Sequence, residues 1–408
     1  MFIETLLFHG FNYQELSLND LASDVSNRYD VEISRQGVDG RFNQSSVKMV
    51  KVLLSNMIDD FKRSHQIDET FSQFRRIRIK DSTSFDLPDN LSELFPGNGG
   101  GASLAGVSVQ YEIDIKHQQS VDFEVTTKAT NDYTNAVETK DSIDKDDLII
   151  RDLGYCSLKM LKEINHKEAY YLNRIKPDVY VFEKQGEIIV RLDIAQIEQT
   201  MRTNGIEIME KEVFLGCKEQ LASRAIFILV PEDKITERVK KQKRKSERRN
   251  SNINEKCLSA LGLNLYVTNT DNNLLPLNHV MLLYKVRWQI ELIFKAWKSV
   301  AQIHLLKKAK PDRVLTMLYL KLLWVFMNMQ MIQEISSVVF KMQKKKLSVF
   351  KAFKVIKMQK DEFRRKITKQ VQLTQLLRKT FKTMLQKAFC ETKKGRTNSI
   401  EIIIEYSK

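Results

Sequence analysis

The stretch that decides the fold runs from His279 to Ser299 and reads HVMLLYKVRWQIELIFKAWKS. It contains neither Gly nor Pro and has the length of a helix, so it predicts one α-helix. One side of that helix is apolar and should be buried: Val286, Ile290, Ile293, Ala296 and Trp297. The other side carries four polar groups within an arc of about 60° and over about 21 Å of the axis: Tyr284, Arg287, Glu291 and Lys298.

This row of polar groups has two interpretations. An ordinary amphipathic surface helix would carry such a face into water. The residue set, however, resembles a specific pattern. Tyr-x2-Arg-x3-Glu-x6-Lys, embedded in YKVRWQIELIFKAWKS, is similar to the signature helix of bacterial DDE transposases of the insertion-sequence-four family, and the flanking words RWQIE and FKxxK match it as well.

Two further blocks resemble that family, and the similarity extends over Phe71 to Phe340. IRIKDSTSF resembles its first-aspartate block and LIIRDLGYCS its second. The resemblance implies an α/β fold, with a ribonuclease H-like catalytic core interrupted by a β-rich insertion and with helical N- and C-terminal regions. The expected limits are 1–70 for an N-terminal region that could bind DNA, 71–165 and 276–340 for the core, 166–275 for the insertion, and 341–408 for a basic C-terminal region.

The residues around the two aspartates support working positions in a sheet. RRIRIKDSTSFDLP alternates apolar and basic residues, which predicts a strand with Asp81 near its end. Leu148 to Ile150 form a continuous apolar run, typical of a strand covered on both faces, which ends just before Asp152. Gly154 permits a turn, and a helix is expected from Ser157 to about Ile164. Open α/β sheets often place functional groups at such a junction, although a surface aspartate that starts a turn is the alternative.

The chemistry of three gathered carboxylates is that of a metal site. Like charges crowded together raise one another's pKa unless a cation neutralises them, and hard cations prefer carboxylate oxygens. The resemblance implies that Asp81, Asp152 and Glu291 bind Mg²⁺ or Mn²⁺, as two ions, and catalyse DNA cleavage and joining. It also implies that the other three signature residues bind phosphates or flipped bases of the DNA ends: Tyr284, Arg287 and Lys298.

The formal net charge of +15 is concentrated in one region. Lys341 to Arg396 holds 19 Lys plus Arg against 3 acidic residues, which indicates a polyanionic partner. Apolar residues recur there at steps of three or four, which predicts a helical face that packs: Phe363, Ile367, Val371, Thr374, Leu377, Phe381, Leu385 and Phe389. A basic amphipathic helix can also lie on a membrane, but the upstream signature favours DNA.

The N-terminal stretch predicts short helices. Ser17-Leu18-Asn19-Asp20 fits a capping box, Ser34 could cap a second helix, and a longer helix is expected over 45–63. Exposed Arg35 and Gln36 would suit a DNA-reading module, but an inert helical cap explains them equally well.

The insertion reads as β-rich, with strand-like runs in DVYVFEK, EIIVRLDI, EIMEKEVFLG, RAIFILV and LNLYVTNTD. Within it, Lys234 to Arg249 holds nine Lys plus Arg against two Glu, which predicts a solvated helix or loop, a phosphate-tracking arm, or both. No Trp lies between Asp152 and Tyr284 to stack on a flipped base, and Tyr266, Phe214 and Phe227 are unassigned substitutes.

Several classes of protein are disfavoured. The four cysteines lie far apart without zinc spacing: Cys156, Cys217, Cys257 and Cys390. This pattern argues against a disulfide framework and fits a reducing, cytoplasmic location, associated with the bacterial nucleoid when bound to DNA. No basic-then-apolar signal segment opens the chain. The most apolar window, Val314 to Phe340, contains enough polar residues to favour a buried core helix over a membrane span.

We therefore expect a DNA transposase of a bacterial insertion sequence that acts as a homodimer on paired transposon ends. Two alternatives remain open. One is a DNA-binding repressor derived from a transposase and lacking catalysis. The other is a nuclease with the same ribonuclease H-like core, which would not need transposon ends and would not transfer strands.

Overall fold

The computed structural model describes residues 2–9, 17–64, 73–98, 103–130, 140–175, 179–248, 260–343, 345–367 and 369–391. The chain divides into two compact units. Unit 1 comprises Met1–Thr70, Asp81–Asn131 and Trp288–Ile404, and unit 2 comprises Phe71–Lys80, Asp132–Arg287 and Glu405–Lys408. The chain thus passes from one unit to the other beside Asp81 and again within the signature segment.

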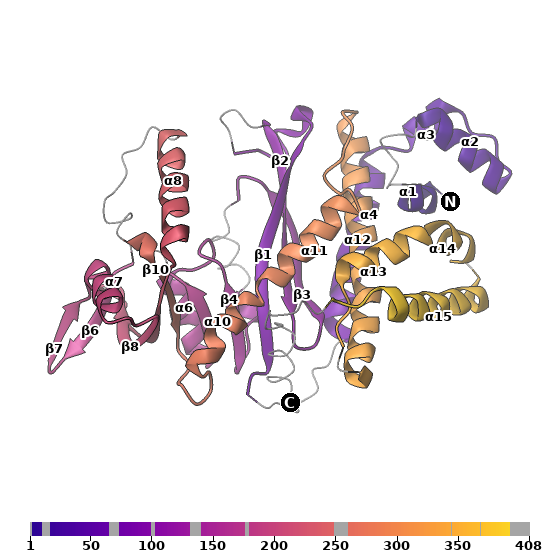
Figure 1. Cartoon of the computed structure of the whole chain (residues 1–408). Coiled ribbons are helices and arrows are strands. Elements are labelled where there is room, and N and C mark those ends of the chain that lie inside the picture. The colour runs from indigo at the N-terminus through magenta and orange to yellow at the C-terminus, as the bar shows by residue number, and fades with distance from the viewer. Residues whose placement is uncertain are drawn as a thin grey trace. The chain divides into compact units, whose positions relative to one another are not determined.

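Unit 2 is built on a mixed sheet in the order β1-β4-β5-β10-β9-β8-β6-β7 (Figure 1). Strand β4 is parallel to both β1 and β5, and the pairs beyond β5 are antiparallel. The strands are β1 (Arg76–Leu87), β4 (Asp147–Arg151), β5 (Tyr170–Arg174), β6 (Val181–Gln185), β7 (Ile188–Arg191), β8 (Ile208–Leu215), β9 (Leu221–Leu229) and β10 (Leu263–Thr268). The strands within the range expected for the insertion, β5 to β10, therefore extend the same sheet as β1 and β4.

Helices cover both faces of this sheet. On one face, α6 (Leu158–His166) and α7 (Ile194–Thr203) bury their apolar sides against β4, β5, β9 and β10. Helix α6 lies where the sequence predicted a helix, with Ser157 capping it through the backbone N–H of Met160, and Asp193 caps α7. On the other face lie α8 (Glu232–Arg248) and α10 (Leu277–Lys285), whose Arg238 and Tyr284 contact Asn264 and Tyr266 of β10. A short 3₁₀ turn, η4 (Ala260–Gly262), precedes β10. The basic run beginning at Lys234 is thus the helix α8.

Unit 1 contains the hairpin of β2 (Ala105–Asp114) and β3 (Gln119–Thr127), with β2 beside β1. Its centre is aromatic: Trp297 contacts Tyr111, Phe123 and Phe294 with ring centroids 5.0, 5.8 and 5.2 Å apart. The long helix α12 (Pro311–Gln343) adds Phe326, 5.3 Å from Phe123. Among the described residues α12 alone is long and apolar enough to cross a membrane, but 83% of its apolar window is buried inside the protein. The predicted core helix is therefore confirmed.

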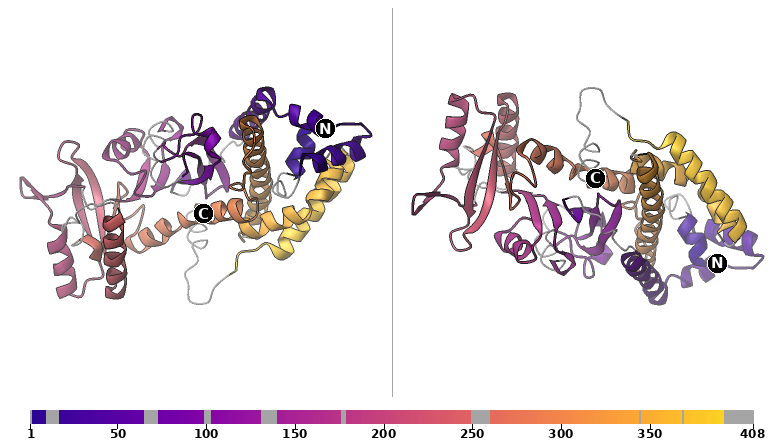
Figure 2. Two further views of the ribbon diagram at one scale, coloured as in Figure 1. Left: turned by 90° about the horizontal axis from the view of Figure 1, so that it is seen from above. Right: turned by 90° about the horizontal axis from the view of Figure 1, so that it is seen from below.

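The remaining helices of unit 1 come from both ends of the chain. They are α1 (Phe2–His9), α2 (Leu18–Tyr29), α3 (Arg35–Gly40), α4 (Gln44–Ser64), α11 (Trp288–Ser299), α13 (Val349–Met358), α14 (Lys360–Lys366) and α15 (Gln370–Lys387). The capping box at Ser17 and the cap at Ser34 are confirmed. Figure 2 shows α1 to α3 beside α14 and α15. Ion pairs hold this arrangement, since Arg364 of α14 binds Asp24 of α2, and Arg313 of α12 binds Asp39 of α3.

Two expectations about individual elements are wrong. Asp81 lies in the middle of β1, not near its end, because alternate burial continues through Thr83, Phe85 and Leu87 and keeps the chain extended. The apolar stripe expected along the C-terminal helices is also out of phase. Val371, Thr374 and Leu377 are exposed, while α15 buries Leu376, Thr380 and Met384. The prediction counted steps of three or four residues without a break. The chain is interrupted between α14 and α15, so the residues of α15 that face inward differ from those counted.

Candidate active site

The predicted signature helix is two helices. Helix α10 ends at Lys285 and α11 begins at Trp288. Between them the backbone tightens: the N–H of Val286 binds the carbonyl of Leu283, and that of Arg287 binds the carbonyl of Tyr284. These are i→i−3 bonds, which interrupt the α-helical pattern without any Gly or Pro. The expectation of one continuous helix is therefore wrong, and the four polar residues divide, with Tyr284 and Arg287 in unit 2 and Glu291 and Lys298 in unit 1.

In unit 2, Asp152 and Tyr284 come together. Asp152 follows directly after β4, whose Leu148, Ile149 and Ile150 are fully buried as predicted. The hydroxyl of Tyr284, on α10, donates a hydrogen bond to Oδ1 of Asp152 over 3.4 Å. Burial raises the pKa of Tyr284, and the negative charge of Asp152 raises it further. The phenol thus remains a proton donor throughout the ordinary pH range.

A second tyrosine supports the first. The ring of Tyr266, on β10, meets that of Tyr284 edge to face with centroids 4.8 Å apart. Tyr266 also lies directly opposite Arg174 in the antiparallel pair of β10 and β5. Its pKa is raised by burial and lowered by the positive charges of Arg174, Arg238 and Arg287. These three guanidinium groups therefore lie near Tyr266.

Arg238, on α8, lies over the same face of the sheet as Tyr266. Its Nη1 donates to the carbonyl of Leu261 over 3.1 Å and its Nη2 to Oδ1 of Asn264 over 3.0 Å. Asn264 and Tyr266 are two residues apart on one strand, so their side chains share a face of the sheet. Burial lowers the pKa of Arg238, and the like charge of Arg174 lowers it further. This face of unit 2 concentrates positive charge beside Asp152.

Arg174 and Arg238 were not predicted from the sequence as individual site residues. Arg238 belonged to the basic run from Lys234 that was expected to track phosphates, but nothing local distinguished it from its neighbours. Arg174 is the last residue of β5 and carries no motif of its own. Only the pairing of β5 with β10 places it beside Tyr266.

In unit 1, the remaining signature residues lie on α11. Glu291 is half-buried in the first turn of the helix. Nζ of Lys298, in its last turn, donates to the carbonyl of Ser84 in β1 over 3.0 Å. Burial lowers the pKa of Lys298, and the charge of Lys128 lowers it further. The helix that carries Glu291 is thus tied to the half of β1 that carries Asp81, whose Oδ1 accepts the N–H of Ser82 over 2.8 Å.

Two tryptophans of α11 differ in their surroundings. Trp297 is fully buried in the aromatic centre of unit 1, as predicted for the apolar side. Trp288, at the start of the helix, is 60% exposed and follows Arg287 in the chain. An exposed indole can stack on a nucleic-acid base, so Trp288 is an available aromatic surface in the signature segment.

The predicted metal ligands are not gathered within either unit. Asp81 and Glu291 belong to unit 1 and Asp152 to unit 2. Among the residues described, no group of three or more His, Cys, Asp or Glu side chains forms a metal site. The convergence of the three acids therefore stays a prediction. Their chemistry fits it, because three carboxylates are the donors that a hard divalent cation selects.

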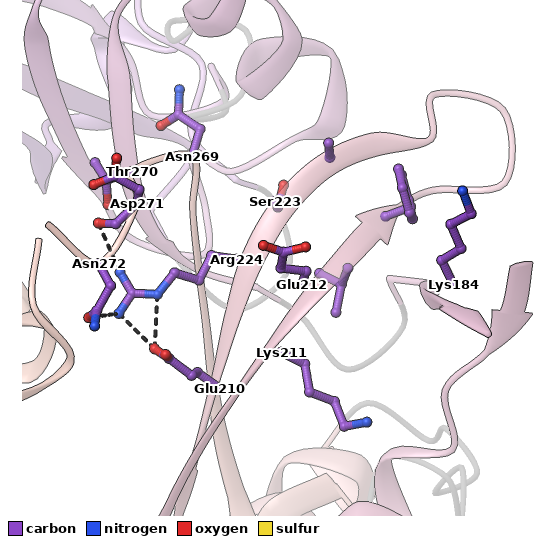
Figure 3. A pocket seen from close by; sticks show the side chains of 13 residues that line it. Lys184, Glu210, Lys211, Glu212, Ser223, Arg224, Asn269, Thr270, Asp271 and Asn272 are labelled. Carbon is purple, nitrogen blue, oxygen red and sulfur yellow. Dashed lines mark hydrogen bonds and ion pairs between the residues drawn. The ribbon is translucent and has the colours of Figure 1, made fainter. Parts of the chain in front are cut away.

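A pocket of about 700 Å³ in unit 2 is lined by none of the predicted site residues. It lies over β8 and β9 and the segment after β10 (Figure 3). Its Arg224 binds Oε2 of Glu210 over 2.8 Å and the carbonyl of Leu275 over 2.7 Å. Because the carboxylate of Glu210 neutralises the charge of Arg224, we assign Arg224 to bracing the turn that leads into α10, not to binding a ligand.

Comparison with known proteins places these residues in context. The family model described as transposase DDE domain matches residues 72–327. The transposase for insertion sequence element IS231F of Bacillus thuringiensis subsp. israelensis is 32% identical over 394 residues, covering 92% of this chain and 82% of that protein. The transposase for IS1151 of Clostridium perfringens is 27% identical over 363 residues, covering 85% and 76%. Among solved structures, a piggyBac transposase synaptic complex with hairpin DNA covers 97% of this chain and 77% of its own, at 12% identity and a TM-score of 0.45.

Proposed function

The chain belongs to the family of transposases with a DDE domain, and from this premise we propose that Asp81, Asp152 and Glu291 are its catalytic acids. It is an insertion-sequence transposase, an enzyme that cleaves DNA and transfers the cut strands. Its fold is mixed α/β, and a ribonuclease H-like core accounts for the strand order β3-β2-β1 in unit 1 and β1-β4-β5 in unit 2. DNA is its partner.

One observation carries the catalytic proposal. In the parallel pair of β1 and β4, Lys80 lies opposite Arg151. The next residue along the chain is an aspartate in both cases, Asp81 within β1 and Asp152 directly after β4. Parallel strands run in the same direction, so residues that follow a matched pair leave toward the same end of the sheet. These matched positions support Asp81 and Asp152 as two of the acids, and the hydrogen bond from Lys298 to Ser84 supports α11 as the source of the third.

The family implies a divalent metal, and we propose Mg²⁺ or Mn²⁺, bound as two ions by the three carboxylates. When bound, such ions supply activation of the attacking oxygen and stabilisation of the leaving oxygen at phosphorus. The chain's own contribution is to hold carboxylates at fixed places, with Asp152 oriented by the hydroxyl of Tyr284. The proposal needs no general-base side chain.

The cationic face of unit 2 supports a role in holding the DNA backbone. We assign Tyr284, Arg287, Arg174 and Arg238 to phosphate binding beside Asp152. A guanidinium can bind a phosphate through two parallel N–H donors, and the single O–H of Tyr284 can donate to a phosphate oxygen in place of Oδ1 of Asp152. Lys298 adds a point charge from α11.

Membership of the insertion-sequence-four family, with the signature Tyr-x2-Arg-x3-Glu-x6-Lys, is part of this proposal, as are the expected domain limits and the homodimer on paired ends.

The test is cleavage and strand transfer of DNA carrying the element's terminal sequence in the presence of Mg²⁺. We expect Glu291→Gln to lose both activities while its DNA affinity is kept. Glu207→Gln is the matched control, because Glu207 is an exposed acid at the edge of β8 with no assigned role. Cleavage by Glu291→Gln at the parent rate would refute the catalytic assignment. DNA binding without any product would indicate the repressor, and cleavage without end dependence or strand transfer would indicate the nuclease.

A further inference from the structure

Strand β7 leaves an open edge at the end of the sheet in unit 2. It pairs with β6 on one side, and no strand within the described part of the chain pairs with its other side (Figure 1). Three consecutive apolar side chains of β7 are exposed: Ile188 by 67%, Ile189 by 39% and Val190 by 38%. Unpaired N–H and C=O groups combined with exposed β-branched residues form a template for another strand.

The sequence of this edge is complementary to itself. The three apolar residues are flanked by Glu187 on one side and Arg191 on the other. When two copies pair antiparallel with Ile189 opposite Ile189, each Glu187 meets the Arg191 of the other copy. Ile189 and Arg191 alternate along β7 and share one face, and Glu187 is the turn residue directly before the strand, so the pairing sets the Ile–Ile contact between two carboxylate–guanidinium pairs. A shift of one residue opposes Arg191 to Ile188 and removes both charge pairs.

We propose that β7 is a self-association surface, on which β7 of a second copy of this chain pairs antiparallel about a twofold axis. This contact is isologous, because the same residues contribute from both copies. The guanidinium of Arg191 is held 4.0 Å from the ring centroid of Tyr180 and is thereby positioned on the hairpin.

The contact area of such short strands lies below that of a standard stable interface, so the dimer of the free chain is weak. Two copies held on paired DNA ends have a much higher effective concentration, which strengthens the pairing. This last step rests on the proposed function.

Disulfide trapping tests the pairing directly. In full-length Ile189→Cys the two introduced thiols face each other across the twofold axis, within the reach of a disulfide. Lys184→Cys is the matched control: Lys184 is exposed and lies opposite Ile189 on β6, away from the open edge. Its two copies would lie about 14 Å apart, three strand spacings, which a disulfide cannot bridge. The parent chain reports cross-linking through its own cysteines.

Under mild oxidation we expect Ile189→Cys to form covalent dimers at least about tenfold faster than the control. The rate should rise further on DNA duplexes carrying the terminal sequence. Equal rates for the two variants, both free and on DNA, would overturn the proposal.

Charge exchange tests the register. In the Ile189→Cys background, Glu187→Arg or Arg191→Glu alone opposes like charges at both ends of the pair and should slow trapping about tenfold. The double exchange restores opposite charges and should restore the rate to within about twofold. Failure of the double exchange to restore trapping would overturn the proposed register. Trapping should be unchanged by Glu291→Gln, so a failed cleavage assay and a failed dimer are distinguishable.

Discussion

Replacement of Arg238 by Ala is the most informative perturbation of the cationic face. The change removes a guanidinium that braces the carbonyl of Leu261 and Oδ1 of Asn264, and it removes one proposed phosphate donor. A hydrogen bond to a charged group contributes about 1.5–3 kcal/mol. DNA affinity should therefore fall about 10- to 150-fold. The slope of log affinity against log salt concentration should become shallower by about 0.9, the value for one lost phosphate contact.

Arg202→Ala is the matched control for this experiment. Arg202 lies on α7, on the opposite face of the sheet, and its Nη2 donates to the carbonyl of Val230 over 3.2 Å. Its charge is neutralised by Glu198, 2.9 Å away. The two variants should lose comparable stability, but only Arg238→Ala should lose DNA affinity.

Fluorescence anisotropy with terminal-sequence DNA at several salt concentrations measures both quantities, and urea titration measures the stability. If Arg238→Ala bound DNA with the parent affinity and salt slope, Arg238 would not contact phosphate. If both variants lost affinity equally, the effect would come from folding of unit 2 and the phosphate assignment would be refuted.

Three further predictions concern unit 1. Replacement of Arg378, Lys382 and Lys387 on α15 by Gln should leave folding intact, because all three are exposed. It should flatten the salt dependence of DNA binding by up to about 0.9 per residue, and an unchanged slope would show that α15 faces away from DNA. Trp297→Ala should lower the free energy of unfolding by about 3–5 kcal/mol in urea titration, whereas a loss below about 1 kcal/mol would contradict its place in the core. Burial lowers the pKa of Lys321 to about 8. The unfolded chain therefore binds more protons between pH 8 and the normal lysine pKa of 10.5, and stability should rise with pH across that window. Lys321→Met should reduce this rise, and an identical pH profile would show that Lys321 is not the titrating group.

The packing of the C-terminal helices changes how the positive charge of that region should be tested. One test of that charge would remove Lys341 to Arg396 as one block. In the structure, Phe353 of α13 is fully buried and lies against Trp324 of α12, with ring centroids 5.9 Å apart. A deletion would therefore remove part of the core of unit 1 along with the charge. Substitution of exposed basic residues separates the two effects.

Local sequence determined the elements whose signals are short-range. The capping box at Ser17, the helix expected from Ser157 and the apolar run before Asp152 each depend on signals within a few residues, and all three are confirmed. Burial of Trp297 and its neighbours on α11 also followed from helical spacing, because a helix within one unit keeps its phase.

The tertiary structure determined three features that the spacing of residues along the chain does not predict. The break between α10 and α11, at Val286 and Arg287, comes from backbone hydrogen bonds and involves no Gly or Pro, so no residue type in the sequence predicted it. The reset between α14 and α15 moved burial from Leu377 to Leu376. Arg174 and Arg238 became candidates only through strand pairing and the packing of α8, since the charge around Asp152 is contributed by residues distant in sequence. Periodicity describes one element at a time, whereas a binding face is made where several elements meet.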